Sequence, residues 1–166
     1  MSGRNVRPRL GTKTGADPVM LDQLISCGLY EGCLEESIKA LKYRFRKQLV
    51  PLLAKELAVA FMSASPTDIK LKRRPNVITW VPMYERQLRW RGFNHSELLA
   101  KELSKIVDIP ARPLLTKCRQ TAFKVSLSPI ARAGNVVGCF EIGKADVSGK
   151  RVVVVDDVVL SGATLS

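Results

Sequence analysis

The chain has few of the residues and segments that mark secreted, metal-binding or membrane proteins. Four of its 166 residues are cysteines, no two of them form a Cys-x-x-Cys pair, and it has one histidine. This pattern is neither a zinc knuckle nor a disulfide framework, and it predicts reduced thiols in the cytoplasm. No apolar run approaches the roughly 20 residues of a membrane span. No apolar segment near the amino terminus indicates a secretory signal, and we find no internal repeat or low-complexity tract.

Acidic residues are scarce relative to basic ones. The chain has 27 lysines and arginines against 15 aspartates and glutamates, a formal net charge of +12. This charge favours polyanionic partners, among them phosphorylated metabolites, nucleic acids and acidic surfaces, without selecting one of them. We expect residues 1–29 to be a basic, disordered tail and lead-in, and residues 30–166 to form one domain.

The most informative segment is Val152–Val155, which continues into Asp156 and Asp157. Four consecutive valines predict a strand buried on both faces, as in a parallel sheet. In open α/β sheets, ligands bind at the carboxyl ends of strands. Adjacent carboxylates suit sugar hydroxyls, and the small and hydroxyl residues that follow suit a phosphate. The pattern therefore predicts a site for a phosphorylated ribose, with the phosphate held by Ser161, Gly162, Ala163 and Thr164.

A second candidate anion site follows a predicted strand at residues 77–81. Arginines alternate there with aromatic residues, just before a helix that Asn94 is expected to cap. Guanidinium groups and helix amino-terminal amides both bind anions, so one interpretation is a diphosphate site. The alternative is a basic surface loop whose aromatic residues pack inward. The residues proposed for the diphosphate are Arg86, Arg89, Arg91 and Gly92. His95 is expected to lie on the helix surface rather than act as a general base.

Helical and strand patterns alternate along the chain. Apolar spacing predicts helices over 34–46, 51–62 and 94–107, and strands over 77–81, 112–117, 136–142 and 152–155. This order indicates an α/β fold with a mostly parallel sheet flanked by helices.

Several motifs, in the same order, resemble the ComF family of type I phosphoribosyltransferase-like proteins. They include Tyr30 and the Lys42-Tyr43 pair, the Val-Pro and Arg-Gly-Phe-Asn segments around residues 81–94, and Gly138-Cys139-Phe140. A further match covers Arg119, Thr121, Leu127, Ser128, Arg132, Asn135 and Val136. The strand with its acid pair and Ser-Gly-Ala-Thr loop is similar to the motif that binds phosphoribosyl pyrophosphate (PRPP) in type I enzymes.

The resemblance implies a phosphoribosyltransferase that moves the phosphoribosyl group of PRPP to a nitrogen nucleophile, with release of pyrophosphate. Asp156 and Asp157 would hold the ribose hydroxyls and bind Mg²⁺ directly or through water. Residues 118–134 would form a lid loop over PRPP. This loop contains three basic residues: Arg119, Lys124 and Arg132.

Departures from the family pattern leave alternatives. The family's cysteine-rich zinc module has no counterpart here, and Lys124 stands where glutamine is usual. The family continues past the phosphate loop with a helix and a strand, whereas this chain stops at Ser166, so we expect an incomplete domain. The competing hypothesis is a non-catalytic competence protein for DNA uptake that binds single-stranded DNA, with nonspecific contacts to the nucleic acid.

Overall fold

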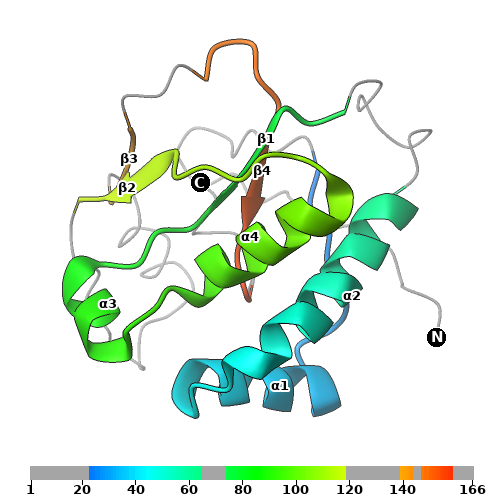
Figure 1. The fold of residues 1–166 in the computed structure, drawn as a ribbon, viewed down its shortest axis with the longest axis vertical. Helices are drawn as coiled ribbons and strands as arrows, with labels where there is room; N and C mark the ends of the chain where they lie inside the picture. The colour runs from blue at the N-terminus through cyan, green and yellow to red at the C-terminus, as the bar shows by residue number, and fades with distance from the viewer. Residues whose placement is uncertain (1–22, 65–73, 119–138, 144–146, 159–166) are drawn as a thin grey trace, which may run out of the picture.

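The computed structural model describes residues 23–64, 74–118, 139–143 and 147–158 of the chain. Its elements, in chain order, are α1 (Gly32–Tyr43), a 3-10 turn (Lys47–Leu49), α2 (Val50–Ser63), β1 (Val77–Trp80), α3 (Glu85–Arg91), α4 (His95–Val107), β2 (Leu115–Lys117), β3 (Phe140–Ile142) and β4 (Val152–Val155). Helix α4 lies across β1 and β4, and α2 packs beside α4 (Figure 1).

Strands β1 and β4 form a parallel pair in which Val77 faces Val152 and Trp80 faces Val155. The carboxyl ends of both strands therefore lie side by side, and the backbone N–H of Val81 donates to the carbonyl of Val155 at 3.0 Å. Strands β2 and β3 form a separate antiparallel pair. The α/β class is confirmed. In place of the expected mostly parallel sheet, the described strands form one parallel and one antiparallel pair.

The core lies between the parallel pair and the two long helices. Every residue of β1 is buried, and Ile78 is fully enclosed in one core cluster with Leu99 and Leu103 of α4 and Leu53 of α2. Strand β4 is less enclosed than the valine run predicts. Only Val155 of its four residues is buried among the described parts of the chain. The burial of β4 is thus concentrated at its carboxyl end, where the acidic residues begin.

Two helix predictions need correction. Helix α1 ends at Tyr43, so Phe45 is not part of its buried face; it is 45% exposed and has a φ of +53°. A left-handed backbone at a bulky residue costs roughly 1–2 kcal/mol. Residues 85–91 form the short helix α3 rather than a loop, and Gly92 ends it with a φ of +76°. By contrast, α2 and the strand at residues 77–80 agree with prediction to within one or two residues.

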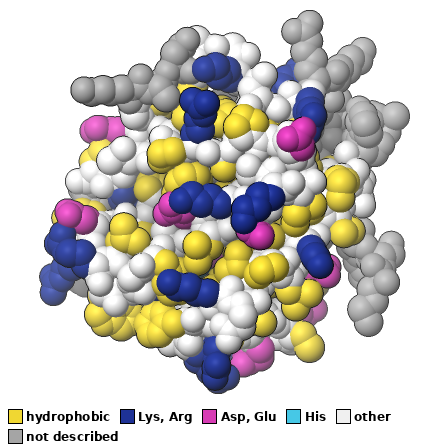
Figure 2. All heavy atoms as spheres, in the orientation of Figure 1, with side chains coloured by type: hydrophobic (Ala, Val, Ile, Leu, Met, Phe, Trp, Pro, Cys, Tyr) yellow, Lys and Arg dark blue, Asp and Glu magenta, His cyan; other side chains and the backbone are white. Residues whose placement is uncertain are grey.

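Basic side chains are spread over the surface. Lysine and arginine side chains lie among apolar ones across the face in Figure 2, and acidic side chains lie beside several of them. No single basic patch dominates this face. None of the helices that the structure describes combines the length and apolar character needed to cross a membrane.

Candidate functional site

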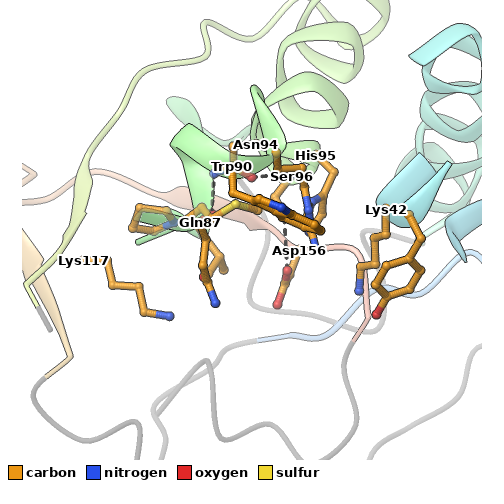
Figure 3. A pocket seen from close by; sticks show the side chains of 13 residues that line it. Lys42, Gln87, Trp90, Asn94, His95, Ser96, Lys117 and Asp156 are labelled. Carbon is orange, nitrogen blue, oxygen red and sulfur yellow. Dashed lines mark hydrogen bonds between the residues drawn. The ribbon is translucent and has the colours of Figure 1, made fainter. Parts of the chain in front are cut away.

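A pocket of about 390 Å³ opens where β1 and β4 end (Figure 3). Its walls come from α1, α3, the start of α4 and the end of β2. Eight of its lining residues are polar or charged: Lys42, Gln87, Arg91, Asn94, His95, Ser96, Lys117 and Asp156. The others are Tyr43, Val81, Pro82, Met83 and Trp90. Its position agrees with the expectation that ligands bind at the carboxyl ends of parallel strands.

Asp156 supplies the carboxylate of this pocket. Its Oδ1 accepts hydrogen bonds from the hydroxyl of Ser96 at 3.2 Å and from the backbone N–H of Asp157 at 2.9 Å. Burial raises the pKa of Asp156, and the neighbouring charge of Asp157 raises it further. A carboxylate that is costly to ionise gains from any cation or hydroxyl donor that enters the pocket.

Asp157 is placed differently from Asp156. Its side chain is only 6% exposed, and its Oδ2 lies 2.8 Å from Nζ of Lys42 and 2.5 Å from Nε2 of His95. Burial alone would raise the pKa of Asp157, but the hydrogen bond and charge of His95, together with Lys42, lower it overall. Asp157 does not line the pocket. The Asp157 carboxylate is instead held inside the protein, by Lys42 of α1 and His95 of α4.

The start of α4 is fixed to the end of β1 by Asn94. The Oδ1 atom of Asn94 accepts from the backbone N–H groups of Ser96 and Glu97, at 3.0 and 3.5 Å, and thereby caps the helix. Its Nδ2 donates to the carbonyl of Val81 at 3.0 Å. The capping interaction predicted from the sequence is confirmed. It orients the first turn, from which His95 reaches Asp157 and Ser96 reaches Asp156.

The four residues proposed for a diphosphate separate into two groups. Arg91 lines the pocket, and its Nη1 lies 3.3 Å from Nδ1 of His95. Arg89 forms an exposed ion pair with Glu85 at 2.6 Å. Arg86 and Gly92 are also exposed, and neither lines the pocket. The structure thus brings one of these three arginines to the acid at the end of β4.

Lys117, at the end of β2, adds a cation that the sequence did not single out. In the view of Figure 3, Asp156 lies between Lys117 on one side and Lys42 on the other. Burial lowers the pKa of Lys117, although the charges of Cys139 and Asp156 act in the opposite direction. Positive charge therefore borders Asp156 from two separate elements, α1 and β2.

His95 contradicts its predicted place on the helix surface. Its side chain is 10% exposed and contacts a buried carboxylate. A histidine next to a helix cap carries no sequence signal for such a partner, because Asp157 lies 62 positions further along the chain. For Lys42, the sequence gives one indication of a functional role, the Lys42-Tyr43 pair that resembles the ComF family.

Several predicted site residues lie outside the described part of the chain. These are the phosphate-loop residues Ser161, Gly162, Ala163 and Thr164 and the lid residues Arg119, Lys124 and Arg132. Within the described residues, no group of three or more histidine, cysteine or acidic side chains could hold a metal ion. Mg²⁺ is commonly held by one or two carboxylates together with substrate phosphates and water, so Asp156 facing a pocket fits that ion.

Comparisons with known proteins give a consistent set of relatives. The chain is 30% identical over 151 residues to the DNA utilization protein YhgH of Escherichia coli strain K12, covering 90% of this chain and 65% of that protein. It is 30% identical over 149 residues to competence protein F of Haemophilus influenzae, covering 87% and 64% respectively. The chain thus spans slightly less than two thirds of these relatives. No protein-family model matches the chain, and no solved structure matches it.

Proposed function

We propose that the chain is a member of the ComF family and serves a competence-related role, since its relatives are named for competence and DNA utilization. We propose further that its pocket binds a phosphorylated ribose such as PRPP. The supporting observation is the arrangement of charge in the pocket. One carboxylate, Asp156, faces a space bordered by Lys42, Arg91 and Lys117. A phosphorylated ribose has the complementary chemistry, with hydroxyl donors on its ring and anionic groups at its ends.

The size of the pocket is compatible with this ligand. A volume of about 390 Å³ lies within the range of roughly 300–1,000 Å³ that is typical of small-molecule sites. The Ser96 hydroxyl, in the first turn of α4, donates to Asp156 within the same pocket. Such polar groups fix the orientation of a ligand more than they add to its affinity.

The proposed reaction is transfer of the phosphoribosyl group to a nitrogen nucleophile. Asp156 would accept hydrogen bonds from the ribose hydroxyls and would offer an oxygen ligand to Mg²⁺. Bound Mg²⁺ would neutralise charge on the diphosphate. Arg91 and Lys117 neutralise the remaining charge as pyrophosphate leaves, which stabilises a transition state in which positive charge develops on the ribose ring. Asp157 holds α1 and α4 in place around the pocket, through Lys42 and His95.

Titration calorimetry with PRPP tests this proposal. We expect binding in Mg²⁺ and much weaker binding in EDTA. Asp156→Asn should weaken binding by about tenfold or more, because a charge-assisted hydrogen bond is worth roughly 1.5–3 kcal/mol. Asp108→Asn is the matched control, because Asp108 is an exposed aspartate that does not line the pocket. Equal affinity in Mg²⁺ and EDTA, or equal losses in both variants, would contradict the proposal.

A second candidate function, binding of single-stranded DNA, is supported by exposed aromatic residues at the pocket rim. Trp90 is 71% exposed, Tyr43 62% and Phe45 45%. The guanidinium carbon of Arg91 lies 5.8 Å from the ring centroids of both Tyr43 and Trp90, and the rings of Phe45 and Trp90 meet edge to face at 6.3 Å. Exposed aromatic rings with adjacent cations are the usual platform for unstacked bases.

Fluorescence anisotropy with a labelled single-stranded oligonucleotide separates stacking from nonspecific attraction. Binding by charge alone should fall steeply as salt rises and be the same for Trp90→Ala and the parent protein. Stacking predicts that Trp90→Ala loses about tenfold in affinity at physiological salt, since a stacked base contributes roughly 1–3 kcal/mol. Trp90→Phe, which keeps an aromatic ring, should lose less. A steep salt dependence with no effect of Trp90→Ala would remove this candidate.

A further inference from the structure

Two cysteines lie at the same end of the β2–β3 pair, Cys118 one residue after β2 and Cys139 one residue before β3. The register of this antiparallel pair places Leu115 opposite Ile142 and Lys117 opposite Phe140. One step further along, Cys118 is opposite Cys139, and the backbone N–H of Cys118 donates to the carbonyl of Cys139 at 2.9 Å. Both side chains are present as thiols.

The geometry of such a pair matches that of a disulfide bond. Directly opposed residues in an antiparallel ladder have Cα atoms about 4.5–5.5 Å apart. Disulfide-bonded cysteines have Cα atoms roughly 4.4–6.8 Å apart, most often about 5.5–6 Å. Opposed side chains also project from the same face of the ladder. We propose that Cys118 and Cys139 form a reversible intramolecular disulfide that fixes β2 to β3.

The different exposure of the two thiols sets the order of the exchange. Cys118 is exposed, whereas Cys139 is fully buried. The oxidant is a small disulfide, such as oxidised glutathione. The Cys118 thiolate attacks it, forming a mixed disulfide and releasing one thiolate. The Cys139 thiolate then attacks the Cys118 sulfur and releases the second. The two protons lost by the cysteines pass to the two released thiolates, so two cysteines are oxidised and one disulfide is reduced to two thiols.

The β2–β3 pair is a part of the fold that such a bond would change. Each strand has three residues, none of them is fully buried, and the pair is separate from the β1–β4 pair. A two-stranded pair on its own is marginally stable in water. Lys117, which lines the pocket, directly precedes Cys118. The disulfide would therefore hold one wall of the pocket in its observed register.

Thiol mapping of the full chain after exposure to oxidised glutathione tests the proposal without use of PRPP. Desolvation and the neighbouring Glu141 raise the pKa of the Cys118 thiol, so the incubation is made in a mildly alkaline buffer. We expect loss of two of the four free thiols and recovery of a cross-linked peptide containing Cys118 and Cys139. Dithiothreitol should restore both thiols.

Single substitutions distinguish this bond from adventitious oxidation. Cys139→Ser should retain glutathione on Cys118, because no second thiol resolves the adduct, and Cys118→Ser should form no cross-link. The control Cys33→Ser, which alters an exposed cysteine elsewhere, should cross-link like the parent protein. Hydrogen exchange at the Cys118 amide should slow by about tenfold in the oxidised protein. A stable glutathione adduct on the parent protein, a different cysteine pairing, or unchanged exchange would overturn the proposal.

Discussion

The Nε2 atom of His95 lies 2.5 Å from Oδ2 of Asp157, and this contact joins the first turn of α4 to the residues that follow β4. Lys42 of α1 reaches the same oxygen at 2.8 Å. Three segments that are distant in the sequence thus meet at one buried carboxylate. Ion pairs of this kind depend on both partners, because loss of one leaves an uncompensated charge in the interior.

We predict that Asp157→Asn destabilises the protein strongly. The substitution leaves the ammonium group of Lys42 without its buried counter-charge, and breaking a buried pair typically costs roughly 3–5 kcal/mol. Urea denaturation at neutral pH, in buffer without metal, measures the loss. Asp156→Asn is the comparison in the neighbouring position, and it should leave stability equal or higher, because burial already disfavours the Asp156 charge. Equal destabilisation by the two substitutions would contradict the different placement of these residues.

The same pair predicts a defined dependence of stability on pH. The pKa of Asp157 is lowered in the folded protein, by His95 and Lys42 against the effect of burial. A lowered carboxyl pKa adds stability at pH values above the unfolded-state pKa of about 3.9, and this contribution is lost as pH falls through the folded-state value. The stability difference between the parent protein and Asp157→Asn should therefore be large near neutral pH and shrink below about pH 4. Urea denaturation over a series of pH values tests this, and a difference that grows towards acid pH would refute it.

The sequence alone predicts those features of the structure that depend only on residues close together in the chain. The strand at residues 77–80, the cap at Asn94 and the acids after the valine strand all follow from local pattern. The role of His95 could not be predicted, because its partner is brought to it only when β4 pairs with β1 and α4 packs across them. The helix at 85–91 is not predicted by local pattern, because Leu88 and Trp90 are its only apolar residues and they form no clear apolar face.

Arg91 and Arg89 should differ in their effect on PRPP binding. Arg91 lines the pocket, whereas Arg89 is paired with Glu85 on the exposed side of α3. If the proposed ligand binds there, Arg91→Ala should reduce its affinity by about tenfold, the usual loss for a charge-assisted hydrogen bond. Arg89→Ala should change it by less than about twofold, since exposed charges are screened by salt. Calorimetry on both variants decides this, and an equal loss from both would indicate attraction by overall charge.

Asn94 offers a test of how the pocket is assembled. Its side chain caps α4 and also donates to the carbonyl of Val81, at the end of β1. Asn94→Ala removes both interactions and should cost about 2 kcal/mol, because a lost cap costs typically about 1 kcal/mol and an unpaired carbonyl adds a similar amount. Asn94→Ser keeps a capping oxygen on a side chain too short to reach Val81, so its loss should be about half as large.

The two Asn94 variants also separate stability from the geometry of the site. With the cap retained in Asn94→Ser, the first turn of α4 should still present His95 to Asp157, and the imidazole NMR signals should stay close to those of the parent protein. Asn94→Ala frees that turn, so the same signals should move towards those of Asp157→Asn, in which the contact itself is altered. Because the chain has a single histidine, the assignment is unambiguous. Unchanged imidazole signals in Asn94→Ala would mean that packing of α4 against β1 and α2, rather than its cap, positions His95.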